Sequence, residues 1–297
     1  MKSYLIIPMG GKGQRFIDSG YNTYKVFLPI DKKNTILEKI ISNFKGLNTQ
    51  VIIIANFKSL GKKYDNILKR KNIHLIDIKN HKKGPLYTLY VAHEKIKNIV
   101  KSNKNIFISY SDINWKWDSK VIKKKIKNKK LIVFTHNQFH PHLEVDSKSD
   151  FCRVTKNKIT DIKEKATFSK DYKNDHLAIG CYYFNKLKYL SNFLEKKYNL
   201  FNQKKEFYMV SLIKYLLKQK IQINNFNINE FVHLGTPDQY IDFLSWKKSF
   251  TNKLNKKNDF KTNATIMLAA GKGERVSNIR ELKPFLNYNN NQIYKYI

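Results

Sequence analysis

Residues 4–15, YLIIPMGGKGQR, decide the fold class of this chain. The run from Tyr4 to Pro8 is short and apolar, as in a buried strand, and a glycine-rich loop follows it at once. Glycines let backbone N–H groups approach a phosphate closely, and Arg15 adds a positive charge beyond them. The stretch therefore predicts an α/β protein with a triphosphate-binding loop after its first strand.

Two other phosphate-binding motifs do not fit these residues. A P-loop needs Gly-Lys followed by Ser or Thr, but Gly13 follows Lys12. The dinucleotide fingerprint needs an acidic residue at the end of a second strand about 20 residues on, and none is present. A tight surface turn is the alternative interpretation of the loop taken alone.

Apolar runs alternate with amphipathic windows through the first half of the chain. The predicted strands are 51–55, 73–78, 105–110 and 130–135, and the predicted helices are 34–47, 60–71 and 85–100. Strands that are apolar throughout and separated by helices indicate a mostly parallel sheet covered on both faces. We therefore expect an α/β fold with a mixed, mostly parallel sheet flanked by helices.

The pattern changes after about residue 136. Short strands with polar turns are predicted at 142–145, 151–155, 158–163 and 177–184, and helices at 187–198, 207–218 and 237–250. Short strands that follow one another closely indicate an antiparallel or mixed extension of the sheet. Such an extension is a common place for a substrate lid.

The composition is strongly basic, but it does not indicate nucleic-acid binding. The chain of 297 residues has 57 Lys and Arg against 23 Asp and Glu, a formal net charge of +34. Only five of the cations are Arg, the residue that reads bases and binds phosphate bidentately. The lysines are scattered over every predicted helix. A solvated basic surface that attracts anionic substrates such as nucleotides is therefore expected.

Cysteine usage and hydropathy indicate the compartment in which the protein is expected. Cys152 and Cys181 have no metal-binding spacing and form no disulfide framework. The apolar run at the N-terminus is too short for a signal peptide or a membrane span, and no later stretch approaches one. We expect a reduced cytoplasmic protein without a membrane partner, and the oligomeric state stays open.

The opening motif occurs a second time near the end of the sequence. Residues 265–275, TIMLAAGKGER, again combine an apolar run with Gly-x-Gly-x-Arg, and KPFL follows at 283–286. We predict one large domain at 1–248, a polar linker at 249–263, and the incomplete start of a second copy of that domain at 264–297. The chain is either a fragment of a longer tandem protein or it carries a truncated remnant.

The order of these motifs resembles the sugar-phosphate nucleotidyltransferase family. Its signature is a strand, then Gly-Gly-x-Gly-x-Arg, then Lys-Pro-Leu, and here Lys25 stands in the second motif, YKVFLP. The resemblance covers residues 3–247 and again 264–297. It implies a Rossmann-like fold of the nucleotide-diphospho-sugar transferase type. It also implies that Arg15 and Lys25 are catalytic. The implied nucleotide-binding residues are Gly10, Gly11, Gly13 and Gly84, the last of them in a loosely matching KGPLYT stretch.

The same resemblance implies a metal site and an acceptor site. Asp112, at the end of the fourth predicted strand, matches the carboxylate that holds Mg²⁺, which prefers oxygen ligands and phosphate. The aromatic residues Trp115 and Trp117 follow it and are expected to wall the site. Acceptor binding is implied for Glu164, Lys165 and Gly180, whose missing side chain would leave room for the acceptor.

The closing motif departs from the family pattern. Residues 231–238, FVHLGTPD, have His233 where the family often has a metal-binding aspartate. Imidazole is a poor Mg²⁺ ligand, so the second carboxylate is either missing or supplied by Asp238.

The implied reaction joins an NTP to a small phosphorylated acceptor and releases pyrophosphate, with Mg²⁺ as cofactor. Neither the base nor the acceptor is determined by the residues. Two alternatives stay open, a glycosyltransferase of the related nucleotide-sugar-binding fold and a degenerate nucleotide-binding homologue without catalysis. The first would prefer Asp-x-Asp at the fourth strand end, where Asp112 is followed by Ile113 and Asn114.

Overall fold

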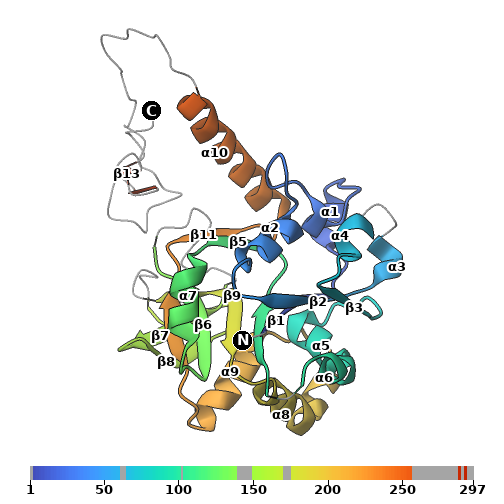
Figure 1. Ribbon diagram of the computed structural model, residues 1–297, viewed down its shortest axis with the longest axis vertical. Coiled ribbons are helices and arrows are strands. Elements are labelled where there is room, and N and C mark those ends of the chain that lie inside the picture. Colours follow the sequence, from blue (N-terminus) through green and yellow to red (C-terminus); the bar gives the residue numbers. More distant parts are fainter. Residues whose placement is uncertain are drawn as a thin grey trace.

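The structure is a computed structural model that describes residues 3–60, 65–101, 103–138, 149–169, 175–255, 287–288 and 291–292. Within them, a nine-stranded sheet forms the centre of the molecule (Figure 1). Its strand order is β3-β2-β1-β4-β9-β6-β10-β8-β7. The predicted fold class is confirmed.

One half of the sheet is parallel, as predicted. Strand β1 (Ser3–Met9) pairs in parallel with both β2 (Thr49–Ala55) and β4 (Asn105–Ser109). Strand β3 (Ile73–Asp77) extends this half beside β2. All seven residues of β1 are buried, because sheet neighbours flank it on both edges and helices cover both faces.

The other half is mixed. Strand β9 (His176–Phe184) runs antiparallel between β4 and β6 (Leu131–His136). The antiparallel hairpin of β7 (Phe151–Thr155) and β8 (Lys158–Lys163) closes this edge, and β10 (Asn224–Asn227) lies between β6 and β8. The expected antiparallel extension is therefore present. The strand predicted at 142–145 lies outside the described residues.

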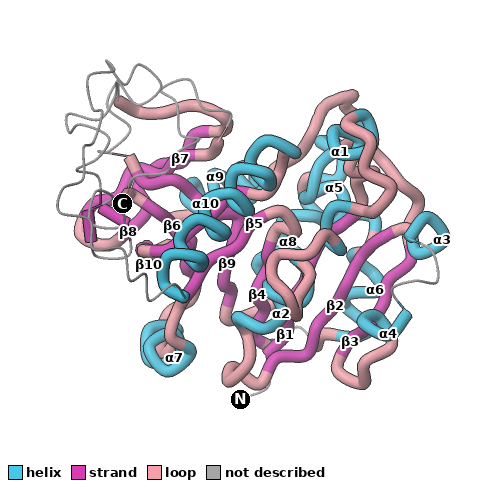
Figure 2. The backbone as a smooth tube through the Cα atoms, turned by 90° about the horizontal axis from the view of Figure 1, so that it is seen from above, coloured by secondary structure: helices cyan, strands magenta, loops and turns pink. Residues whose placement is uncertain are grey.

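Alternate side chains of β1 enter two separate cores. Leu5 and Ile7 pack on one face with α2 (Ile36–Asn43), α7 (Ser119–Ile126) and the start of α10 (Pro237–Asn255). Tyr4 and Ile6 pack on the opposite face. The helices of that second face are α5 (Gly84–Val91), α6 (His93–Ile99), α8 (Lys188–Lys196) and α9 (Met209–Lys218), which lie below the sheet in Figure 1 and therefore behind it in the view of Figure 2. The strand period of two thus divides the apolar residues between two layers of helices.

Several predicted boundaries were wrong. The helix predicted at 85–100 is two helices, α5 and α6, which meet at Ala92, a turn residue that ends the first helix and caps the second. The window 60–71 contains the end of α3 (Phe57–Leu60) and all of α4 (Asp65–Leu68), and residues 61–64 are outside the described part. Helix α10 continues to Asn255, into the predicted linker.

The structure describes only a small part of the predicted second repeat. Of the predicted second repeat, only β12 (Asn287–Tyr288) and β13 (Asn291–Gln292) are described, and they pair antiparallel.

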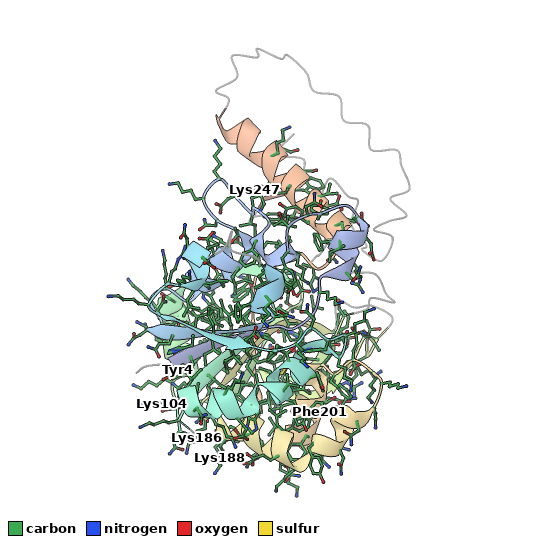
Figure 3. All side chains as sticks on the ribbon, turned by 90° about the vertical axis from the view of Figure 1, so that its right-hand side faces the viewer. Tyr4, Lys104, Lys186, Lys188, Phe201 and Lys247 are labelled. Carbon is green, nitrogen blue, oxygen red and sulfur yellow. The ribbon has the colours of Figure 1, made fainter. Side chains whose placement is uncertain are left out.

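Lysines lie at opposite ends of the molecule, Lys247 on α10 and Lys104 and Lys186 far from it (Figure 3). No helix in the described residues is long and apolar enough to cross a membrane.

Candidate active site

A cleft of about 320 Å³ opens where β1 and β4 end. Ligands of α/β proteins bind at the carboxyl ends of parallel strands, and this volume is in the range of ligand pockets. The cleft brings most of the predicted site residues together. Those that line it are Gly10, Gly11, Gly13, Arg15, Lys25, Gly84 and Asp112.

The loop after β1 is built around two glycines with different constraints. Gly13 has φ of +68° and precedes the short helix α1 (Gln14–Asp18), which carries Arg15. Gly10 is needed for space, because a Cβ atom there would lie 2.4 Å from His81 Nε2 and 2.6 Å from Thr88 Oγ1. The local geometry therefore requires glycine at positions 10 and 13, and these residues bring backbone to the cleft surface.

Lys25 and Asp112 form an ion pair in the cleft although 87 residues separate them. Lys25 begins a 3₁₀ helix (Lys25–Phe27), Asp112 follows β4, and Nζ lies 2.9 Å from Oδ2. The side chains are 17% and 33% exposed. Burial by itself would raise the pKa of Asp112, but the charge and hydrogen bond of Lys25 bring that pKa below its usual value, with a weaker contribution from His233. Asp112 is therefore ionised at neutral pH.

A small second sheet brings the closing motif to Asp112. Strand β5 (Ile113–Lys116), which was not predicted, pairs antiparallel with β11 (Glu230–His233), and the backbone N–H of Leu234 donates to the carbonyl of Asp112 at 2.7 Å. Gly235 lines the cleft, and a Cβ atom there would lie 3.3 Å from Asp112 Oδ2. His233 and Asp238 are not among the residues that line the cleft.

The described residues contain no cluster of three His, Cys, Asp or Glu side chains that could hold a metal by itself. Mg²⁺ is commonly bound through one or two carboxylates together with substrate phosphates. Asp112 fits that mode as one ionised carboxylate in a cleft large enough for a ligand that carries phosphates. The role of His233 as a ligand stays a prediction.

Two cleft residues that sequence reasoning missed, Glu206 and Tyr208, connect the predicted acceptor-binding lysine to the cleft. Glu206 Oε2 accepts hydrogen bonds from Lys165 Nζ at 3.2 Å and from the Tyr208 hydroxyl. Lys165 Nζ also lies 4.6 Å from the centre of the Tyr208 ring. Burial favours a higher pKa for Glu206, but these two hydrogen bonds, with the charges of Lys165 and Arg15, lower that pKa below its usual value. Glu164, by contrast, is exposed and does not line the cleft.

His81 was also missed, and it holds the loop from the α5 side of the cleft. Its backbone N–H donates to the Gly10 carbonyl at 3.1 Å, and its Nε2 lies 3.0 Å from Thr88 Oγ1. Burial and the nearby Lys83 lower the pKa of His81, so the ring is neutral at physiological pH. The available signal was the loose match of residues 83–89, which directed attention to Gly84 and not to the preceding histidine.

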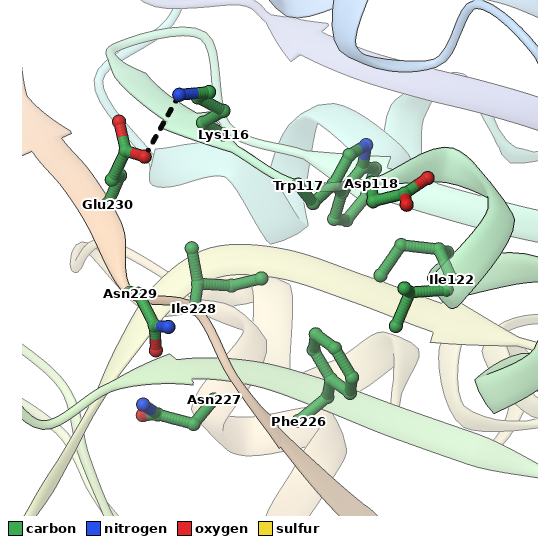
Figure 4. Close-up of a pocket in the computed structure, with 10 residues that line it drawn as sticks. Lys116, Trp117, Asp118, Ile122, Phe226, Asn227, Ile228, Asn229 and Glu230 are labelled. Carbon is green, nitrogen blue, oxygen red and sulfur yellow. Dashed lines mark hydrogen bonds and ion pairs between the residues drawn. The ribbon is translucent and has the colours of Figure 1, made fainter.

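The expectation that Trp115 and Trp117 wall the cleft was wrong. Trp115 is 2% exposed in the core, with its ring centre 5.9 Å from that of Phe44. Trp117 instead lines a second hollow of about 350 Å³, which we call the apolar groove (Figure 4). Its wall is formed by Trp117, Ile122, Phe226 and Ile228, with the Lys116–Glu230 ion pair at its rim. The two tryptophans are two residues apart and pack against each other, with ring centres 5.3 Å apart, so both face the core side of β5 and neither lines the cleft.

Searches of the sequence against protein-family models and against the curated proteins found no match. Solved structures do match over most of the chain. A nucleoside-diphosphate-sugar pyrophosphorylase from Vibrio cholerae has a TM-score of 0.65 and 18% identity, covering 81% of this chain and 99% of its own. A putative glucose-1-phosphate thymidylyltransferase from Bacillus anthracis has a TM-score of 0.64 and 16% identity, covering 83% and 95%.

A third solved structure belongs to the same group. The inositol-1-phosphate CTP transferase from T. maritima has a TM-score of 0.62 and 14% identity, and the match covers 84% of this chain and 97% of that chain. The structural similarity establishes the fold, but at identities this low it leaves the substrates open. The chain therefore has the fold of the sugar-phosphate nucleotidyltransferases, as its motifs indicate.

Proposed function

We propose that this protein transfers an NMP from an NTP to a small phosphorylated acceptor and releases pyrophosphate. One observation carries the proposal. The glycine loop with Arg15, then Lys25, and then Asp112 come from three separate parts of the sequence and line the same cleft. The likeness of the fold to known nucleotidyltransferases supports the same reaction class.

The reaction needs no nucleophile from the protein. An oxygen of the acceptor phosphate attacks the α-phosphorus, a new P–O bond forms, and the bond to the bridging oxygen breaks, so that pyrophosphate leaves with the electron pair. The protein contributes position and charge neutralisation. Backbone N–H groups at Gly11 and Gly13, with Arg15 and Lys25, are suited to holding the triphosphate.

Asp112 is the residue best suited to hold Mg²⁺ together with the substrate phosphates. When bound, Mg²⁺ would supply further neutralisation of charge on those phosphates. Lys25 contacts the same carboxylate, so the cation and the carboxylate predicted from distant motifs lie at one place.

A glycosyltransferase of the related fold is the competing function. It would favour a second carboxylate two residues after Asp112, but Asn114 stands there, in strand β5 opposite Val232. Pyrophosphate release separates the two reactions, because glycosyl transfer from a nucleotide sugar yields a nucleotide and no pyrophosphate.

The test is pyrophosphate release from each NTP with a panel of phosphorylated acceptors. We expect Lys25→Ala and Asp112→Ala each to lower the rate by about 100-fold or more, because charge stabilisation in a closed site is lost. The matched controls are Lys69→Ala and Asp65→Ala, which break an exposed ion pair of 2.6 Å outside the cleft. Circular dichroism checks folding. Turnover at the control level in both cleft variants would defeat the proposal.

A further inference from the structure

Tyr110 fills the space beside Gly180. Gly180 lies in β9 with φ of +81°, and the Tyr110 N–H donates to its carbonyl at 2.9 Å. A Cβ atom at Gly180 would lie 2.6 Å from Tyr110 Cδ2 and 2.9 Å from Cγ. The missing side chain therefore accommodates the Tyr110 ring, and nothing else can lie between the two residues.

The Tyr110 ring is fixed at its far end as well. Its hydroxyl accepts a hydrogen bond from the backbone N–H of Met209 at 3.2 Å. Met209 begins α9, where the first N–H groups have no partner within the helix, so displacing the ring would leave a donor unsatisfied. The ring of Tyr182 lies 6.0 Å away, centre to centre. The Tyr110 ring is therefore held in one position and forms a fixed wall of the cleft.

This wall stands beside the predicted acceptor-binding groups. Tyr110 lines the cleft together with Glu206 and Tyr208, and Lys165 contacts both of the latter. The segment that carries Glu206 is anchored on the other side too, because Phe207 N–H donates to the Lys83 carbonyl at 2.9 Å. Both boundaries of this end of the cleft are thus held by backbone hydrogen bonds.

On the basis of the proposed function, we propose that Tyr110 is a specificity-determining residue that excludes acceptors with a sugar ring. A phenol ring and a pyranose ring are of similar size, so they cannot occupy the same place against Gly180. The acceptor class that fits is a phosphorylated short-chain alcohol or amino alcohol. Its hydroxyl or ammonium group would donate to the carboxylate of Glu206, while Lys165 is near enough to neutralise its phosphate.

The experiment compares glycerol 3-phosphate, phosphoethanolamine and glucose 1-phosphate as acceptors, with pyrophosphate release as the readout. For the wild type we expect at least one of the two small acceptors to exceed glucose 1-phosphate in kcat/KM by about tenfold or more. Tyr110→Ala removes the ring and should shift this ratio toward glucose 1-phosphate by about tenfold. Tyr110→Phe keeps the ring and should retain the wild-type ratio. Tyr110→Leu serves in place of the alanine variant if that variant does not fold.

Two outcomes would overturn the inference. One is equal use of glucose 1-phosphate and the small acceptors by the wild type. The other is an unchanged ratio in a folded Tyr110→Ala or Tyr110→Leu protein. The absence of pyrophosphate with every acceptor defeats the proposed function instead. In that case titration calorimetry with glycerol 3-phosphate and glucose 1-phosphate tests the wall alone. The wild type is then expected to bind glycerol 3-phosphate with a lower Kd than glucose 1-phosphate, and Tyr110→Ala is expected to shift this ratio of Kd values toward glucose 1-phosphate. The absence of either effect overturns the inference.

Discussion

The cleft and the apolar groove are hollows of nearly equal volume, about 320 and 350 Å³, but their linings differ in kind. The cleft collects a glycine loop and the charged side chains of Arg15, Lys25 and Asp112. The groove collects Trp117 and Phe226. Volume therefore does not identify a phosphate site in this protein. The proposed phosphate site rests instead on backbone N–H groups and cations at the carboxyl ends of parallel strands.

The two hollows also differ in what builds them. The cleft lies where β1 and β4 end, and loop residues such as Gly10, Gly11 and Asp112 form part of its wall. The groove lies among α7, β5 and β10, and its lining side chains also pack against the core. Changes in the groove are therefore expected to alter stability, and changes in the cleft are expected to alter turnover as well.

The largest expected effect on stability comes from the groove. Trp117→Ala removes a ring whose centre lies 5.0 Å from those of both Phe44 and Phe134. We expect the free energy of unfolding, measured in urea, to fall by about 3 kcal/mol. Pyrophosphate release per folded molecule should stay at the wild-type level. A folded Trp117→Ala protein without turnover would break the contrast between groove and cleft.

In the cleft, two adjacent glycines differ in what they tolerate. Gly10→Ala places a methyl group against His81 and Thr88. We therefore expect the free energy of unfolding to fall by about 2 kcal/mol and NTP to bind more weakly. Gly11→Ala is the matched control, because no atom lies within 4 Å of its added Cβ. The free energy of unfolding of the Gly11→Ala variant should change by about 0.5 kcal/mol or less. Urea unfolding and calorimetric NTP titration measure both variants, and equal losses at the two positions would contradict the crowding at Gly10.

Asp150, behind the acceptor side of the cleft, should make stability depend on pH. Burial raises its pKa to about 6, although its side chain accepts a hydrogen bond from the Lys165 N–H at 3.1 Å. The folded protein then holds this proton more tightly than the unfolded chain. The contribution of Asp150 is therefore most favourable below about pH 4 and is lost as the pH rises to about 6.

Asp150→Asn keeps an oxygen for the Lys165 N–H and removes the charge. At pH 7 the variant should be more stable than the wild type by about 2 kcal/mol, and the difference should vanish toward pH 4. Urea unfolding of both proteins from pH 4 to pH 7 measures it. A difference independent of pH would show that Asp150 titrates normally.

The smallest effect is expected at the rim of the groove. Lys116 and Glu230 form an ion pair of 3.1 Å whose side chains are 73% and 52% exposed. Water and salt screen such a pair, so Lys116→Ala should change the free energy of unfolding by about 0.5 kcal/mol or less, with no effect on pyrophosphate release. A clear loss of turnover would show that the groove takes part in the reaction.

Local patterns predicted the parallel half of the sheet well. Apolar runs such as Val51–Ala55 are buried strands, and the loop from Gly10 to Arg15 follows β1 as expected. Strands β5 and β11 were missed because each has only four residues, too few for a period of two to be distinguished from chance. Glu206 was missed for a related reason, since a single carboxylate in a Lys-rich stretch carries no pattern of its own.

The sequence by itself determined the strand–loop unit at the start of the chain and the division of its apolar residues between two faces. These depend on residues close together in sequence, where spacing and backbone preference act directly. The tertiary structure alone decided that Lys25 meets Asp112, that Lys165 meets Glu206, and that Tyr110 lies against Gly180. Such pairings depend on strand order and register, which long-range packing selects and no local pattern encodes.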